Sequence, residues 1–156
     1  MSSEASEQET FTRICLLGTG SFGNVLKVKS SKTNEVVAVK VFNRTTTKRE
    51  SAMREFKTMR RLTHVNVVSA LKFYEGKDKF YLLMELCEHN SLKELMTVRL
   101  TFTDTEAKFF MRDVLNGLIY LHAEGVVHRD VKLANLLLDL HLNVKSPSSS
   151  GTQNVV

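Results

Sequence analysis

Three glycines at a fixed spacing, Gly18, Gly20 and Gly23, lie between two stretches that have the pattern of β-strands. The apolar residues before them end at Leu17, and the strand-like residues after them begin at Val25. Because glycine has no side chain, a turn built from it can approach a phosphate group closely. The same spacing occurs in dinucleotide-binding turns, but such a turn opens a helix and an acidic residue follows about 20 positions later. Taken alone, the glycines fit a plain turn or a dinucleotide turn as well as a nucleotide lid, and the strand residues after them favour a hairpin lid over a nucleotide.

The rest of the first half has the pattern of an antiparallel sheet with one helix. The β-branched run Val36–Phe42 predicts a strand, and further strands are expected at Val67–Tyr74 and Phe80–Leu86. A capping box, Thr47-x-x-Glu50, predicts the start of the helix. With the two strands around the glycines, this gives a compact lobe of five strands and one helix before residue 87. The apolar face of the helix recurs every three residues, at Met53, Phe56 and Met59.

The second half becomes helical beyond Asn90. A short helix is expected at Ser91–Met96. A second capping box, Thr103 to Glu106, predicts the start of a long helix that ends at Gly125. Loop and short strands are expected from there to residue 142. The apolar stripe expected along the long helix consists of Phe110, Met111, Val114, Leu118 and Leu121.

The length of 156 residues suits one domain with a buried core. We expect an α+β fold with a five-stranded antiparallel first lobe at 11–86 and an incomplete, mainly helical second lobe at 87–145. Disordered tails are expected at 1–10, which is polar, and at 146–156, which is Ser-rich.

Composition and charge exclude several classes of partner. The formal net charge is +5, but the Lys and Arg residues are scattered rather than interleaved with aromatic residues, so we expect no nucleic-acid partner. No apolar run approaches the ~18 residues that cross a bilayer, so we expect no membrane partner. The N-terminus has no signal-peptide pattern, and Cys15 and Cys87 lack the spacing of metal ligands. These features predict a cytoplasmic or nuclear protein with free thiols.

Two charged residues in the first half have a spacing that suits phosphate binding. Lys40 ends the β-branched strand, and Glu55 follows fifteen residues later on the helix. A carboxylate at that position can hold the lysine extended toward a phosphate group. Each residue alone fits an ordinary surface position. Their joint occurrence between the glycines and the segment 128–135 favours a functional pair.

The segment His128-Arg129-Asp130-Val131-Lys132-Leu133-Ala134-Asn135 concentrates polar side chains. Asp130 can accept a proton from an attacking hydroxyl group, and Lys132 can neutralise charge on a moving phosphoryl group. Asn135 offers a neutral oxygen to Mg²⁺, which prefers oxygen ligands. We interpret His128 as a packed structural residue, and Arg129 fits a surface ion pair.

In this order, the patterns G-x-G-x-x-G-x-V, V-A-V-K, a helical Glu and H-R-D-x-K-x-x-N resemble the N-terminal part of eukaryotic protein kinases. Lys132 is typical of the serine/threonine class. Within that class, four segments are similar to polo-like kinases: 85–87, 91–95, 102–110 and 132–138.

The resemblance implies ATP and Mg²⁺ as cofactors and proteins with Ser or Thr as substrates. It implies catalytic roles for Asp130, Lys132, Lys40 and Glu55, and Asn135 as a metal ligand. Arg129 would sense a phosphate on an activation loop, and a polo-like kinase would be expected at the centrosome or centriole. Adenine would be held by backbone groups of the inter-lobe hinge. The residues implied in nucleotide binding are Leu17, Gly18, Gly20, Gly23, Val25, Ala38, Lys40, Met84, Glu85, Cys87 and Leu137.

The residues after Lys145 depart from the family pattern. Family sequences continue with Asp-Phe-Gly, whose Asp is the main magnesium ligand, whereas this chain has Ser146-Pro147-Ser148. Loss of that ligand is expected to lower the rate roughly a thousand-fold or more. We therefore expect a kinase domain truncated before this motif and weakly active or inactive alone. The alternative is a non-catalytic fragment that acts as a protein-interaction or dominant-negative module.

Overall fold

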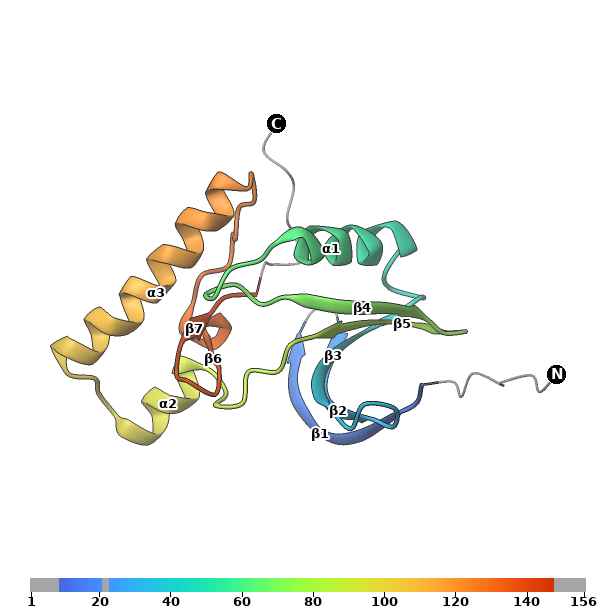
Figure 1. The fold of residues 1–156 in the computed structure, drawn as a ribbon, viewed down its shortest axis with the longest axis horizontal. Helices are drawn as coiled ribbons and strands as arrows, with labels where there is room; N and C mark the ends of the chain where they lie inside the picture. The colour runs from blue at the N-terminus through green and yellow to red at the C-terminus, as the bar shows by residue number, and fades with distance from the viewer. Residues whose placement is uncertain (1–8, 21–22, 148–156) are drawn as a thin grey trace.

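The computed structural model describes residues 9–20 and 23–147. The chain folds into a five-stranded antiparallel sheet with one helix, followed by a mainly helical part, so the predicted fold class is confirmed (Figure 1). The elements are β1 (Phe11–Gly20), β2 (Gly23–Ser30), β3 (Val36–Asn43), α1 (Arg49–Arg61), β4 (Ala70–Glu75), β5 (Lys79–Met84), α2 (Leu92–Arg99), α3 (Asp104–Ala123), a 3-10 turn at Leu133–Asn135, β6 (Leu137–Leu138) and β7 (Val144–Lys145).

The sheet has the strand order β1-β2-β3-β5-β4 and is apolar on both faces. Side chains alternate between the faces along β3, because successive residues of a strand point to opposite sides. Ala38 and Phe42 belong to a core cluster that includes Ala52 and Met59 of α1. Val37 and Val39 belong to a second cluster on the other face. Helix α1 therefore covers one face, and the curled strands β1 to β3 enclose the other (Figure 1).

The helix starts differ in how well the sequence predicted them. Helix α3 begins at the predicted capping box, where the Thr103 hydroxyl accepts a hydrogen bond from the Glu106 N–H. The capping box predicted at Thr47 is wrong, because α1 begins at Arg49 after Lys48, with no side-chain cap. The N–H of Thr47 instead bonds to the Asn43 carbonyl at 2.9 Å, which closes a turn before the helix. A capping box between Ser91 and Glu94, which the sequence prediction missed, opens α2.

The apolar stripe of α3 is partly as predicted. Phe110, Val114 and Leu121 are buried, and Leu118 packs against the same cluster as the first two. Met111 was assigned to this stripe wrongly, since its side chain is 51% exposed. It follows Phe110 by one residue and so lies about 100° around the helix. Gly125, with φ of 69°, lies just past the helix end as predicted.

The expected tails are partly ordered at their inner ends. Glu9 hydrogen-bonds to Ser30, Lys72 and Tyr74, and Thr10 bonds to Ser31. These two residues were placed in the disordered tail, and that expectation is wrong for them. Likewise, Ser146 forms a parallel bridge with Val67, so it does not belong to a disordered tail. The remaining tail predictions, at 1–8 and 148–156, lie outside the described residues.

The two parts of the molecule meet along the segment that follows α1. The side-chain amide of Asn66 donates to the Val144 carbonyl at 2.9 Å, and the Ser146 N–H donates to the Asn66 carbonyl at 3.0 Å. Arg61 adds a bond to the Glu124 carbonyl at 2.8 Å. No helix in the described part of the chain has the length and apolarity to cross a membrane.

Candidate nucleotide-binding and phosphotransfer site

The glycine-rich hairpin has two glycines with different local demands. Gly23 has φ of +135°, and a Cβ built on it would lie 1.9 Å from the Val41 carbonyl oxygen. A Cβ on Gly18 would meet nothing within 4 Å. Gly18 pairs with Val25, and Gly20 pairs with Gly23 across the hairpin. Gly23 is therefore required by the backbone itself, whereas Gly18 leaves open space where a phosphate group could approach.

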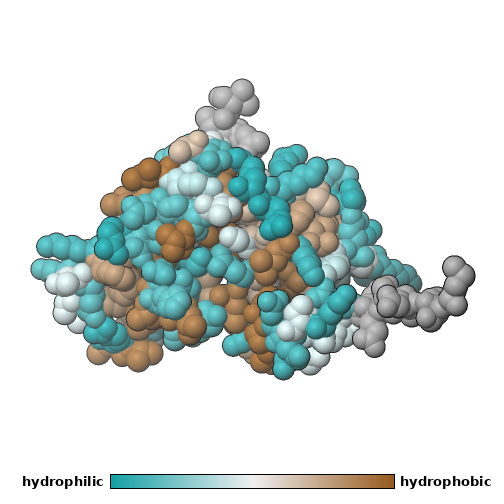
Figure 2. Space-filling model, viewed as in Figure 1, coloured by the Kyte–Doolittle hydropathy of each residue, from teal (hydrophilic) through white to brown (hydrophobic). Residues whose placement is uncertain are grey.

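Five of the residues implied in nucleotide binding have side chains in one apolar cluster. Ala38 and Met84 are buried at 5% and 8% exposure. Val25, Cys87 and Leu137 pack against the same cluster from β2, from the segment after β5 and from β6. Together these five side chains join the sheet to the helical part. Figure 2 shows hydrophobic surface on both sides of a notch at the lower edge of the molecule, between the half with α2 and the half with β1.

Leu17 does not join this group of side chains. It is 40% exposed and lies outside the apolar cluster. The register of the β1–β2 pair shifts between Leu16 and Gly18, at the position of Leu17. The structure thus brings the side chains of Val25, Ala38, Met84, Cys87 and Leu137 together and leaves Leu17, which was also implied in nucleotide binding, at the surface.

The segment after β5 crosses between the two parts of the molecule. The Glu85 carboxylate accepts the Ser69 N–H at 2.7 Å and pairs with the Lys145 ammonium at 2.9 Å. Among the hydrogen bonds of the described residues, none uses the carbonyl of Glu85 or the N–H of Cys87. Burial raises the pKa of the Cys87 thiol to about 12, so this residue is a neutral thiol at physiological pH. Its side chain contributes by packing against the apolar cluster.

Lys40 and Glu55 form the ion pair that the sequence predicted. The Lys40 ammonium lies 2.7 Å from a Glu55 carboxylate oxygen. The side chains are 16% and 8% exposed, so water screens the pair only weakly. Lys40 shares its face of β3 with Ala38, which belongs to the apolar cluster. The Lys40 ammonium group is therefore held at a fixed place next to this apolar cluster.

The second polar group is centred on Asp130. Its carboxylate accepts from the Lys132 ammonium at 2.8 Å and from the Asn135 amide at 2.8 Å. The bonds from Lys132 and then Asn135 lower the pKa of Asp130, so its carboxylate is ionised at neutral pH. An ionised, half-exposed carboxylate can accept a proton from a hydroxyl group that approaches from solvent.

His128 and Arg129 shape the backbone beside Asp130. His128 is 2% exposed, and its Nδ1 accepts the Asp130 N–H at 3.2 Å, as expected for a packed structural histidine. Burial lowers the pKa of the His128 ring, which keeps the ring neutral at physiological pH. Arg129 has φ of 62°, a conformation that side-chain-bearing residues adopt infrequently. Such backbone strain occurs preferentially at functional sites.

Comparison with known proteins agrees with this geometry. Residues 11–146 match the family described as the protein kinase domain. The chain belongs to the protein kinase family. Serine/threonine-protein kinase PLK4 of Danio rerio is 33% identical over 142 residues, which is 88% of this chain and 15% of that protein. Serine/threonine-protein kinase plk-2 of Caenorhabditis elegans is 37% identical over 133 residues, which is 83% of this chain and 21% of that protein.

Similarity is not confined to polo-like kinases. The NUAK family SNF1-like kinase 1 of Homo sapiens is 34% identical over 133 residues, which is 83% of this chain and 20% of that protein. The chain spans about a fifth or less of the length of these three relatives. The match to the protein kinase family extends from the start of β1 to the residue after β7.

The kinase residues present do not make a complete metal site. No group of three His, Cys, Asp or Glu residues in the described part of the chain could hold a metal ion. The amide nitrogen of Asn135 faces Asp130, so the Asn135 carbonyl oxygen is the atom that could coordinate a cation. One neutral oxygen is a weak ligand set for Mg²⁺, which is usually held by one or two carboxylates besides substrate phosphates.

Two structural contacts of this kinase domain were missed from the sequence. Lys145, 8% exposed, is paired with Glu85 across sixty residues of chain. Asp113 of α3, 5% exposed, accepts the Val144 N–H at 3.2 Å. Both contacts hold β7 in place. Residues so far apart in sequence show no spacing pattern that predicts their contact. The one available signal was the carboxylate of Asp113 within the otherwise apolar stripe of α3.

The two glycines of the hairpin give a matched test. Gly23→Ala is expected to lower the free energy of unfolding by about 2 kcal/mol or more, because a Cβ there meets the Val41 carbonyl and the φ is positive. Gly18→Ala should change it by less than about 0.5 kcal/mol, since its Cβ enters open space. Urea unfolding of both variants measures the difference. Equal stability of the two variants would contradict the geometry of the hairpin.

Proposed function

We propose that this chain is the nucleotide-binding part of a serine/threonine protein kinase, which binds ATP between the glycine-rich hairpin and β6. The observation that carries the proposal is the Lys40–Glu55 ion pair at 2.7 Å, on the strand that also supplies Ala38 to the apolar cluster. A buried carboxylate that fixes a lysine beside an apolar slot is what binding of a purine with phosphates requires. The similarity to the serine/threonine-protein kinases PLK4 and plk-2 supports the serine/threonine class.

The roles of individual residues follow from their positions. Adenine would lie between Val25 and Ala38 on one side and Leu137 on the other, with Met84 at the back. The Glu85 carbonyl and the Cys87 N–H would bond to the purine edge. Lys40 would bind the phosphates beneath Gly18 and Gly20. A hydrogen bond from its ammonium group to a phosphate oxygen is stronger than one between neutral groups, because both partners are charged.

The transfer step would depend on the Asp130 group. The ionised carboxylate of Asp130 would accept the proton of a Ser or Thr hydroxyl on a protein substrate as that oxygen attacks the γ-phosphorus. Lys132, 2.8 Å from Asp130, would offset negative charge on the phosphoryl group. When bound, Mg²⁺ supplies charge neutralisation at the phosphates, and Asn135 would be its ligand from this chain.

Phosphotransfer by this chain is proposed to be weak, because Ser146-Pro147-Ser148 follows Lys145 where the kinase pattern has the magnesium-binding Asp-Phe-Gly. The same observation favours a second candidate function, a non-catalytic module that binds nucleotide and the regulators of a related active kinase. The two candidates share the nucleotide site and differ in turnover. Measurements of binding and of transfer therefore separate them.

ATP binding is expected to raise the melting temperature of the chain by several degrees, since ligand at about a hundred times its Kd stabilises by about 2.7 kcal/mol. The shift should persist when EDTA removes Mg²⁺, because one neutral oxygen contributes little to binding. Lys40→Met should abolish the shift. Lys57→Met, an exposed lysine on α1, is the matched control and should retain it. A shift that survives Lys40→Met would contradict the proposed site.

Transfer of labelled phosphate from Mg-ATP to a generic protein acceptor is expected to be about a thousand-fold below that of an active kinase domain. Any residual transfer should disappear in Asp130→Ala, which removes the proton acceptor. Thermal unfolding of that variant checks that it is folded. Robust transfer by the unaltered chain that Asp130→Ala abolishes would overturn the proposal of weak activity and exclude the non-catalytic candidate.

A further inference from the structure

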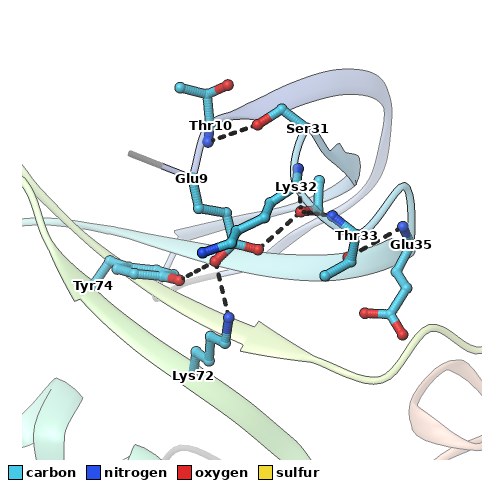
Figure 3. A network of polar contacts seen from close by, with 9 residues as sticks. Glu9, Thr10, Ser31, Lys32, Thr33, Glu35, Lys72 and Tyr74 are labelled. Atoms are coloured by element: carbon cyan, nitrogen blue, oxygen red, sulfur yellow. Dashed lines mark hydrogen bonds and ion pairs between the residues drawn. The ribbon is translucent and has the colours of Figure 1, made fainter. Parts of the chain in front are cut away.

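The two edge strands of the five-stranded sheet are connected by one carboxylate. Strands β1 and β4 lie at opposite ends of the strand order. Glu9, two residues before the start of β1, nevertheless bonds to two side chains of β4 (Figure 3). The rings of Phe11 and Tyr74 lie 5.8 Å apart next to it. The sheet is therefore curled enough for its edges to meet across the face opposite α1 (Figure 1).

Both oxygens of the Glu9 carboxylate accept hydrogen bonds. One oxygen accepts from the Ser30 hydroxyl at 2.8 Å. The other accepts from the Tyr74 hydroxyl at 2.7 Å and the Lys72 ammonium at 2.9 Å. The bonds to Lys72, Tyr74 and Ser30, in that order, lower the pKa of Glu9 to about 2. The carboxylate is thus ionised and held from β2 and β4 at any pH near neutral.

Strand β1 has few other restraints. It pairs with β2 alone, and that pairing is irregular at two places, between Arg13 and Cys15 and between Leu16 and Gly18. Ile14 and Leu16 are about half exposed. A strand of this kind, rich in glycine and with one partner, has a weakly specified register. The two bonds between Thr10 and Ser31 and the contacts of Glu9 fix its first residues.

We propose that Glu9 is a positioning residue, which fixes the register of β1 and so places Gly18 and Gly20 over the phosphates of a nucleotide. The part that concerns nucleotide rests on the function proposed above, and the part that concerns the strand does not. Glu9 contacts no nucleotide in this account. It acts through β1, whose start it holds and whose far end carries the glycines.

Hydrogen exchange of the ligand-free chain tests the effect on the strand. Glu9→Gln keeps the shape of the side chain but removes its charge, and amides of residues 11–18 should exchange about fivefold to tenfold faster. Glu35→Gln is the matched control, because Figure 3 shows the Glu35 carboxylate directed away from the cluster, and it should leave β1 unchanged. Lys72→Met removes the partner from the other edge and should reproduce the effect of Glu9→Gln. Unaltered exchange of β1 in both variants would overturn the proposal.

The affinities of the chain for ATP and for adenosine distinguish a positioning role of Glu9 from a general loss of stability. Adenosine depends on the apolar cluster, whereas the phosphates lie under β1, so Glu9→Gln should weaken ATP binding about fivefold and adenosine binding less than twofold. Equal weakening of both ligands would show a merely structural role and contradict the positioning proposal. If the unaltered chain binds neither ligand, the proposed function fails, and the exchange measurement still decides whether Glu9 fixes β1.

Discussion

The structure depends on the way Asn66 joins the sheet to the helical part. Asn66 is 3% exposed, and its side-chain amide and its backbone carbonyl both bond to the segment 144–146. A Cβ on Gly117 of α3 would lie 2.9 Å from the Asn66 carbonyl oxygen, so the helix approaches this loop as closely as a glycine allows. Buried amide groups are costly to leave without partners, and these bonds therefore favour one arrangement of the two parts. The geometry of any site formed between the two parts therefore depends on this junction.

The proposed nucleotide site is such a site. Val25, Ala38 and Met84 come from the sheet, while Leu137 comes from β6, which pairs with β7. Strand β7 is held by Asp113 from α3 and by the Lys145–Glu85 pair. The Asp130 group lies just before β6 in the chain, so the same restraints that place Leu137 also place the carboxylate. A series of buried contacts that begins at Asn66 and passes through β7 and β6 therefore positions the Asp130 group.

Much of this could be predicted from the sequence, because local patterns carried it. Glycine spacing followed by strand residues predicted the hairpin, and the Thr103–Glu106 capping box predicted the start of α3. The pairing of Lys40 with Glu55 was predicted from their joint occurrence between the glycines and the segment 128–135, and the distance of 2.7 Å bears out the pairing. Predictions failed where two local patterns compete. Thr47 fits a helix cap and a turn end equally well, and the turn to Asn43 forms instead. Met111 is adjacent to Phe110 on the buried face of α3, and a periodic pattern does not sharply separate the buried and exposed faces of a helix at such a position.

Contacts between distant residues could not be predicted. Glu9 stands in a polar stretch of low apolar content, and only the curl of the sheet brings it to Lys72 and Tyr74. Lys145 gives no local sign of its partner Glu85. These contacts depend on the tertiary fold, and we propose that they also set how β1 and β7 lie against the proposed nucleotide site.

The central claim is that residues from both parts of the molecule form one ATP site. At 17.7 kDa the chain is suited to amide-resolved NMR, and titration with ATP tests the claim most directly. The account predicts shifts in the amides of the glycine-rich hairpin, of residues 85–87 and of residues 128–138 with a single dissociation constant. The outer face of α3, where Leu115 and Ile119 are exposed, should not respond. Shifts confined to one part of the molecule, or spread over basic surface residues without saturation, would contradict it.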